Sequence, residues 1–494
     1  MEKLIKKLRN INPALKWILI ILVIYISIQI LGSMFPETIL SKIASGLQNI
    51  KSAVFSIQAL QLILSLSILV VLHELGHFIP ARLFKTRVEK FYLFFDPYFS
   101  VFKKKVGETE YGVGWLPLGG YVKISGMIDE SMDKEQMKKP AESWEFRAKP
   151  AWQRLIIMLG GVTVNFILAI FVFSLVLFKW GETYVSNDDV VNGVVCSDFV
   201  KQYGFKNGDK IISIKGDEIV RFRDVERKMI MNDKSFEVVV NRGDEDTTIV
   251  VPDGFITDFK NSDKERMFLP RTTLLIEAVV SGSNADKAGL KKGDLIYAVD
   301  SSSNIVTYKD ELSLVLNDLL KKEVYKTILY VKRDGFDREL KCDLSNDGVL
   351  GFYSFGIKTT TKNYGLLESF GSGYKLTMTH LKDYVKGIQM LVNPKNELGD
   401  QLGGFGAIGG MFGDKWNWHS FWYMTALLSL ILAFMNLLPI PALDGGHVMF
   451  LIYEIIARKP VPDKVLEYSQ MIGMIILLSL LVFANGNDIL KAFN

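Results

Sequence analysis

One five-residue pattern in the sequence is typical of metal-dependent hydrolysis, His73-Glu74-Leu75-Gly76-His77. Two histidines four residues apart lie on one face of a helix, so both imidazoles can reach a single Zn²⁺ ion. Glu74 lies beside them, where it can act as a general base toward water. A catalytic zinc site also needs a third protein ligand and an open coordination position. The pattern therefore predicts a zinc site that this segment leaves incomplete.

The candidate for the third ligand is Asp444, which follows an apolar segment interrupted by Pro439 and Pro441. Irregular backbone at membrane depth is tolerated where protein or a water-filled cavity surrounds it. His447 is a rival ligand that we rank below Asp444. The alternative interpretation is an ordinary loop that carries a solvated aspartate. We expect Asp444 to complete the site.

The zinc-binding pattern lies in an apolar segment long enough to cross a bilayer, which takes about 20 residues. Hydrophobic residues make up 49% of the 494-residue chain and charged residues 23%, so we expect spanning helices joined to a soluble region. A secretory signal peptide is the alternative for the first segment, but its length and the missing cleavage site favour an uncleaved anchor. The expected spans are residues 17–35, 59–79, 155–178, 421–438 and 471–484.

Lysine and arginine are concentrated in the N-terminal tail, in residues 82–154 and in residues 458–464. Five crossings place these segments on one side, which the positive-inside rule makes the cytoplasm. His73 precedes Arg82 by nine residues, about 13 Å of helix, and Asn165 follows Arg154 by eleven, about 16 Å. We therefore expect both side chains, and Asp444, at one level in the inner half of the bilayer.

An internal repeat lies in the long region that this orientation places outside. Residues 204–211 are echoed by residues 289–296, and both copies combine glycines with an aspartate that can bond backbone amides. Strand-like runs follow each copy, at 211–214 and 236–240 and again at 296–299 and 327–331. This arrangement looks like a tandem of PDZ domains, which bind extended peptides by strand addition. The alternative is that these two domains only pack against the rest of the protein or exclude other molecules, without binding a peptide terminus.

The two cysteines, Cys196 and Cys342, fall in different copies of the repeat. Two cysteines cannot form a disulfide framework or a cysteine-based zinc site. One bridge between them would require an oxidising compartment, and nothing in their spacing implies it.

Small residues in the third expected span, Gly160 and Gly161, share a face with Asn165. Small residues let helices approach closely, and an asparagine can hydrogen-bond between helices. One interpretation gives Asn165 a contact with the substrate backbone or the reacting carbonyl. The other is plain helix packing.

Residues 112–124 form a glycine-rich apolar strand pattern between two expected spans, and they contain Gly119, Gly120 and Tyr121. The pattern predicts a hairpin that dips into the membrane beside the zinc. An unfolded stretch of a substrate helix could pair with its edge. A hairpin on the protein surface is the alternative.

Together these residues resemble the site-2 protease family of intramembrane zinc metalloproteases, in its bacterial RseP-like branch with tandem PDZ domains. The resemblance runs from about Leu60 onward and is carried by the five-residue pattern, residues 119–121, residues 146–154, Asn165, the repeat and residues 436–446. It implies that Glu74 activates water and that zinc is held by His73, His77 and Asp444. It assigns substrate binding to Asn165, Asn436, Gly119, Gly120, Tyr121, Pro439 and Pro441.

The resemblance also implies a substrate class, namely transmembrane segments of single-span proteins, such as anti-sigma factors already trimmed outside, and signal-peptide remnants. Two features depart from the family. Residues 17–35 add a span to the four of the family core, and residues 403–410 lack the Gly-Pro found in many members. The argument that residues 403–410 bind substrate is therefore weaker.

We therefore expect a polytopic α-helical membrane protein with four core spans, an extra N-terminal span, two extracytoplasmic mixed α/β PDZ domains and a cytoplasmic-side membrane-associated β-hairpin or sheet. Its expected location is the bacterial inner membrane. The expected segments are residues 1–54 (tail and extra span), 55–84 (zinc helix), 85–153 (hairpin), 154–180 (span), 181–270 and 271–360 (PDZ domains), 361–418 (amphipathic connector) and 419–494 (C-terminal spans).

Three functions fit this organisation, and proteolysis within the membrane leads. A PDZ scaffold with a degenerate protease core need not keep a complete set of His73, Glu74, His77 and Asp444. A zinc-dependent transporter would need more intramembrane carboxylates and repeated spans. The expected partners are transmembrane substrates and lipid, with the outer domains as a size filter. A net charge of +4 gives no argument for nucleic acid.

Overall fold

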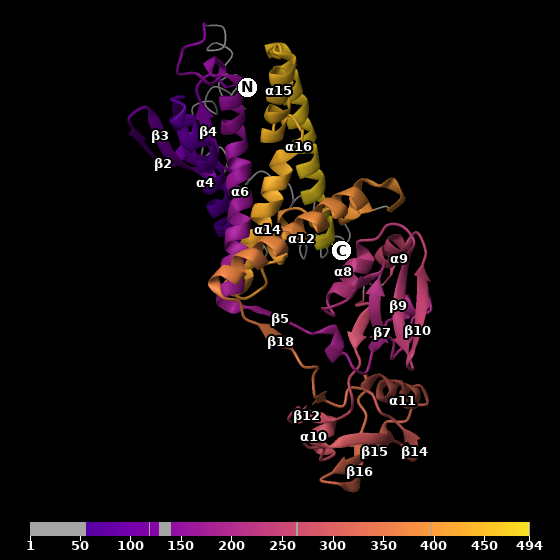
Figure 1. Ribbon diagram of the computed structural model, residues 1–494. Coiled ribbons are helices and arrows are strands. Elements are labelled where there is room, and N and C mark those ends of the chain that lie inside the picture. Colours follow the sequence, from indigo (N-terminus) through magenta and orange to yellow (C-terminus); the bar gives the residue numbers. More distant parts are fainter. Residues whose placement is uncertain (1–55, 118, 128–139, 263–264, 397, 494) are drawn as a thin grey trace, which may run out of the picture. The chain divides into compact units, whose positions relative to one another are not determined.

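A computed structural model describes residues 56–493 except 118, 128–139, 263–264 and 397 (Figure 1). The expected span at 17–35 lies outside the described residues. The chain divides into two compact units, the first made of residues up to Phe173 and from Asp400 onward, the second of Ser174–Gly399.

Four described helices are long and apolar enough to cross a membrane. They are α4 (Ile57–Leu83), α6 (Ala151–Trp180), α14 (Trp418–Leu437) and α16 (Asp463–Phe493). The first three match expected spans to within four residues at each end. Helix α16 is far longer than the expected 471–484, because polar residues on both sides of the apolar run continue the helix without adding to its hydropathy.

The fourth expected span does not simply turn back after Leu437. The two prolines and their neighbours form an irregular loop, residues 438–443, in which Ala442 has a φ of +80°. A second apolar helix, α15 (Asp444–Ala457), then begins at the candidate ligand itself. Helix α16 packs on this loop so closely that a Cβ added at Gly473 would overlap the carbonyl of Pro441. The loop is therefore fixed by its neighbours.

A four-stranded sheet lies between α4 and α6 in the chain, with the order β2-β3-β1-β4. Its strands are β1 (Val88–Leu93), β2 (Phe95–Val106), β3 (Thr109–Leu116) and β4 (Tyr121–Ile124). The expected hairpin at 112–124 is wrong as a topology, because β3 and β4 lie on opposite sides of β1, and the hairpin is β2–β3. Strand β1, which comes earlier in the chain, lies between β3 and β4, and its Tyr92 is paired with both Gly112 and Tyr121.

The repeat in the second unit forms two similar antiparallel sheets, β10-β9-β7-β8 and β14-β13-β15-β16. All four strand-like runs expected from the sequence are strands. The first sheet and its helix comprise β7 (Lys210–Ile214), β8 (Asp217–Glu218), α8 (Asp224–Ile230), β9 (Phe236–Arg242) and β10 (Glu245–Val251). The second comprises β13 (Leu295–Val299), β14 (Ser301–Ile305), α11 (Lys309–Lys321), β15 (Lys326–Arg333) and β16 (Phe336–Asp343).

Each copy of the repeat buries its aspartate completely and pairs it with an arginine from a later strand. Asp209 accepts from the backbone N–H of Lys206 and from the guanidinium of Arg242, and Asp294 accepts likewise from Lys291 and Arg333. The bonds to the backbone were expected, whereas the arginines were not. Cys196 and Cys342 are free and lie in the separate cores of the two copies.

A two-stranded ribbon brackets the repeat. Strand β5 (Glu182–Tyr184) enters the region, β18 (Thr360–Lys362) leaves it, and the two pair antiparallel. The remaining described elements are η1 (Phe146–Ala148), η2 (Asn187–Asp189), β6 (Val194–Cys196), α7 (Asp198–Lys201), α9 (Phe255–Asn261), β11 (Phe268–Pro270), β12 (Ile276–Val279), α10 (Asn284–Lys287), β17 (Phe352–Ser354), α12 (Leu366–Val392), η3 (Pro394–Asn396), η4 (Leu398–Gln401) and α13 (Phe405–Gly410).

Candidate metal and catalytic site

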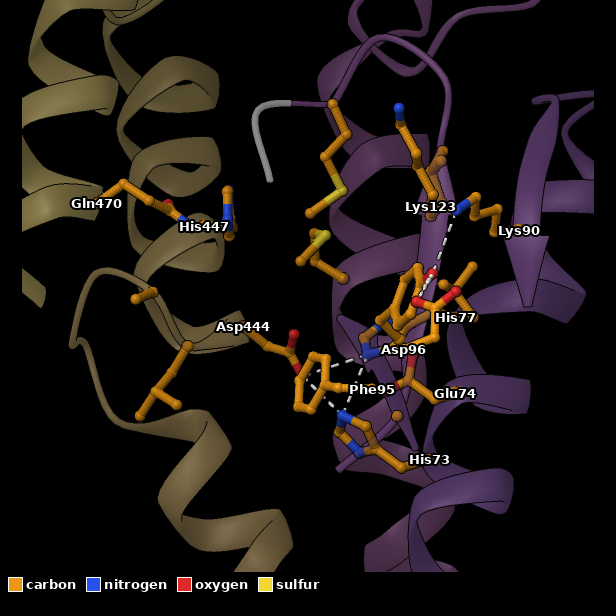
Figure 2. Close-up of a pocket in the computed structure, with 18 of the residues that line it drawn as sticks. His73, Glu74, His77, Lys90, Phe95, Asp96, Lys123, Asp444, His447 and Gln470 are labelled. Carbon is orange, nitrogen blue, oxygen red and sulfur yellow. Dashed lines mark hydrogen bonds and ion pairs between the residues drawn. The ribbon is translucent and has the colours of Figure 1, made fainter. Parts of the chain in front are cut away.

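Three donor atoms from two distant segments converge in the first unit (Figure 2). The Nε2 atoms of His73 and His77 are 3.3 Å apart, and each lies 3.3 Å from Oδ2 of Asp444. A tetrahedral site with bonds of about 2.0 Å places its ligand atoms about 3.3 Å from one another. The equilateral triangle of donors therefore fits a zinc ion bound by three ligands, with the fourth position open.

The histidine rings are held by contacts on their other nitrogens. Nδ1 of His77 lies 2.8 Å from the carbonyl oxygen of Ile157, so it donates there and leaves the Nε2 lone pair free. Nδ1 of His73 lies 3.1 Å from the side-chain amide of Asn165. The buried Oδ1 of that amide has no partner. With the amide reversed, Oδ1 would accept from Nδ1 of His73 and orient this ring in the same way.

The structure brings both expected asparagines to the same histidine. The amide nitrogen of Asn436 lies 3.3 Å from Nε2 of His73, beside the three donors. Asn165 is fully buried, and its backbone carbonyl accepts from the hydroxyl of Ser429 at 2.8 Å. Asn436 belongs to α14, so α6 and α14 both supply an amide to the metal-site helix α4.

The small-residue face of α6 packs directly against α4. A Cβ added at Gly76 would lie 2.5 Å from the carbonyl oxygen of Gly160, so the two backbones are in contact. A Cβ added at Gly161 would lie 2.6 Å from Cε1 of His73 and would overlap Nε2 of His77. Helix packing is therefore one role of these glycines. The sequence did not reveal the other, which is that Gly161 leaves room for the imidazoles.

A cavity of about 800 Å³ opens onto the three donors and contains the side chain of Glu74. Gly120 and Tyr121, which the resemblance assigns to substrate binding, both line it. A Cβ added at Gly120 would lie 3.6 Å from Cγ of Glu74, so β4 runs close beside the expected base. The cavity thus joins the donor triangle, the expected base and the edge of the sheet.

Five of the seven expected substrate-binding residues do not line this cavity, namely Gly119, Asn165, Asn436, Pro439 and Pro441. Ala442 and Leu443 line it instead, because the proline loop, residues 438–443, faces the cavity with its C-terminal end. His447 also lines it, but among the described residues the close donor group contains only the other two histidines and Asp444. The geometry favours Asp444 over His447.

The lining residues that sequence reasoning missed include Lys90 and Asp96. Lys90 belongs to β1 and Asp96 to β2, and both side chains are drawn with the other lining residues in Figure 2. Ionisable residues in the segment between two expected spans were the signal that could have revealed them.

Comparison with known proteins agrees with this geometry. The model of peptidase family M50 matches residues 61–480. A putative zinc metalloprotease of Vibrio cholerae is 29% identical over 460 residues, which cover 86% of this chain and 97% of that protein. The regulator of sigma E protease of Haemophilus influenzae is 28% identical over 453 residues, with coverages of 87% and 98%. The metalloprotease MmpA of Caulobacter vibrioides is 26% identical over 451 residues, with coverages of 88% and 96%.

The fold, the donor triangle and these matches together define a zinc metalloprotease with membrane-spanning helices. The chain belongs to peptidase family M50, the site-2 proteases, and its relatives include the regulator of sigma E protease of Haemophilus influenzae. The family expected from the sequence is thereby confirmed, and zinc is its metal.

Proposed function

We propose that this protein hydrolyses peptide bonds inside the transmembrane segments of single-span membrane proteins. The donor triangle carries the proposal, because His73 and His77 lie inside the apolar helix α4, and Asp444 begins the apolar helix α15 directly after the loop that separates it from α14. Hydrolysis at that depth needs water, and the cavity of about 800 Å³ offers it a place.

Each side chain of the site has a distinct proposed role. His73, His77 and Asp444 would hold zinc, which when bound supplies Lewis acidity toward the scissile carbonyl. Glu74 takes a proton from the attacking water and returns it to the leaving amine, which is general base and then general acid catalysis. Asn165 orients the ring of His73, and we retain its expected contact with substrate as part of the proposal.

The substrate is proposed to bind as an extended strand along β4. Among the described strands, β4 is paired with β1 and lies at the edge of the sheet. Gly120 lets that edge pack next to Glu74, because a Cβ there would lie 2.6 Å from the carbonyl oxygen of Tyr92. The side of β4 away from β1 offers its backbone groups to an extended chain. Asn436, beside His73, would then contact the substrate backbone near the cleaved bond.

The proposed substrates are anti-sigma factors already trimmed outside and remnant signal peptides. The name of the Haemophilus influenzae relative, a regulator of sigma E protease, supports the first class. The proposed location is the bacterial inner membrane, with the site toward the cytoplasm and the two PDZ-like domains outside. There they would act as a size filter or contact the substrate.

A cleavage assay in a lipid bilayer tests this function. The full-length protein in nanodiscs is mixed with a single-span substrate that carries a short outer segment, and the products are mapped by mass spectrometry. We expect a cut within the apolar segment, loss of cleavage after treatment with a zinc chelator and recovery after zinc is returned. Cleavage confined to the aqueous segments, or unaffected by the chelator, would contradict the proposal.

A further inference from the structure

A small polar cluster lies on the sheet side of the active-site cavity. Lys90 on β1 and Asp96 on β2 line the cavity (Figure 2), and Tyr121 on β4 lines it as well. The hydroxyl of Tyr121 donates to Oδ1 of Asp96 at 2.8 Å and lies 3.5 Å from Nζ of Lys90. A positive and a negative group therefore face one space, with a phenol between them.

The bonding capacity of this cluster is only partly used. The ammonium of Lys90 has three donors, yet its hydrogen bond to Tyr121 is long, and its other contacts are the faces of Tyr92 and Tyr121 at 5.4 and 6.0 Å. The carboxylate of Asp96 accepts from Tyr121 and from Ser100 at 2.9 Å, which leaves about two of its four acceptor positions. Both groups can still bond to a molecule in the cavity.

The cluster lies at the depth of the catalytic base. Tyr121 directly follows Gly120, whose added Cβ would lie 2.7 Å from Cγ1 of Val70 and 3.6 Å from Cγ of Glu74. Ionisable groups in a membrane are costly to keep unless a function needs them. If this wall only had to close the cavity, apolar side chains like the neighbouring Phe95 and Leu116 would do so at lower cost.

We propose that Lys90 and Asp96 form a specificity subsite that selects a carboxamide side chain, glutamine or asparagine, in the substrate segment. The proposal rests on the proteolytic function argued above. A carboxamide presents a carbonyl acceptor to the ammonium and N–H donors to the carboxylate at the same time. A charged side chain would gain one attraction and one repulsion, because it would meet both the ammonium of Lys90 and the carboxylate of Asp96. A neutral group with an acceptor and a donor is complementary to both, so it fits best.

The place of this subsite along the substrate follows from β4. A strand beside β4 places successive residues about 3.3 Å apart. Tyr121 is one residue from the glycine that faces Glu74, so the selected side chain belongs to a residue within about two positions of the cleaved bond. The subsite therefore predicts a preference at one defined position rather than a general tolerance of polar segments.

A substrate scan with three variants tests the proposal. The probe is a single-span peptide with an Ala/Leu segment, in which each leucine is replaced in turn by glutamine, and kcat and KM are measured with the full-length protein in nanodiscs. Lys90→Met removes the donor, and Asp96→Asn leaves one acceptor oxygen. Glu110→Gln is the matched control, because Glu110 accepts from Tyr92 at 2.7 Å in the same network but does not line the cavity.

With the wild-type protein we expect glutamine at one position to raise kcat/KM about tenfold over leucine, the factor of roughly one net hydrogen bond. Lys90→Met and Asp96→Asn should each bring this ratio close to one, whereas Glu110→Gln should keep it. Equal cleavage of all probes by the wild type would overturn the subsite, as would a preference that survives in both variants or is lost in the control. Absence of any cleavage would instead contradict the proposed function itself.

Discussion

At the scale of single residues, the arrangement around the donor triangle explains why a glycine lies next to the two histidine ligands. The imidazoles of His73 and His77 occupy the space that a side chain at residue 161 would take. Their outer nitrogens contact Asn165 and the carbonyl of Ile157, so ring orientation is set before a metal arrives. The glycine is as much a part of this site as the histidines.

Replacing Gly161 with alanine should therefore lower zinc occupancy. Its Cβ would meet both rings and turn the Nε2 atoms away from their common centre. We expect a decrease in zinc affinity of about ten- to a hundredfold, the range seen when ligand orientation is disturbed. Zinc is measured by mass spectrometry after dialysis against graded chelator.

The matched control is Gly387→Ala, another helical glycine, whose added Cβ has open space around it. It should retain the zinc content of the wild type. If Gly161→Ala retained it as well, the space-keeping role of this glycine would be wrong.

Much of the site could be predicted at this scale, but not all of it. Two histidines four residues apart and an aspartate after a helix-breaking loop are local signals, and the structure brings these three side chains together. Lys90 and Asp96 could not be found in this way. Their common position depends on strand pairing, which places residues of β1, β2 and β4 against one cavity.

At the scale of elements, the proline loop is positioned by the helix that packs on it. Gly473 allows α16 to touch the carbonyl of Pro441, three residues before Asp444. The third donor is thus held through contact between the loop and α16. This contact could not be derived from the sequence, because Gly473 lies in an apolar run with no distinctive pattern.

Gly473→Ala should displace the loop and reduce both zinc occupancy and cleavage. The overlap of the new methyl group with a backbone oxygen cannot be relieved by a change of rotamer, so we expect a cost of about 1–3 kcal/mol. Gly486→Ala in the same helix has open space and is the control. Equal zinc content and equal thermal stability of the two variants would show that the contact does not position Asp444.

The buried aspartate of the second repeat copy predicts a response to acid. Burial opposes ionisation of Asp294, but the paired guanidinium of Arg333 and the amide of Lys291 outweigh it and hold the pKa below its usual 3.8. A depressed folded pKa adds stability above the unfolded pKa, and this stability is lost as the pH falls through the folded value.

Resistance of residues 272–355 to pepsin should therefore decline as the pH falls below about 4. Asp294→Asn should be less resistant near pH 5 and should change less on acidification, because the group that titrates has been removed. The full-length protein is digested at graded pH and the fragments are quantified. Parallel pH curves for the two proteins would mean that this ion pair is not the cause.

The register of the sheet marks a further limit of sequence reasoning at this scale. The strand pattern of residues 112–124 was visible, but the pairing of the strands β3 and β4 that it covers was not. Adjacent strands in the chain usually form a hairpin, and here the earlier β1 separates them. The long-range pairing of Tyr92 with Gly112 and Tyr121 decides the order.

At the scale of the whole molecule, the paired strands β5 and β18 make residues 185–359 an insertion with adjacent ends. The proposed size filter can therefore be removed without separating the helices on either side. Residues 185–359 would be replaced by an Asn-Gly turn, which joins two antiparallel strands in two residues.

If the filter proposal is right, this deletion should permit cleavage of substrates that keep a bulky outer domain, while trimmed substrates are cut by both proteins. Cleavage is followed by gel mobility of tagged substrate in nanodiscs. Continued rejection of the bulky substrate by the deletion protein, with the trimmed one still cut, would show that the outer domains are not the filter.

The central claim is that Glu74 activates water beside a zinc ion held by His73, His77 and Asp444. The most direct measurement compares zinc content and cleavage in Glu74→Gln and Asp444→Asn. Glu74→Gln should keep its zinc and lose cleavage by about a hundredfold or more, because the proton acceptor is gone. Asp444→Asn should lose zinc together with activity. Full cleavage by Glu74→Gln, or full zinc retention by Asp444→Asn, would contradict the account.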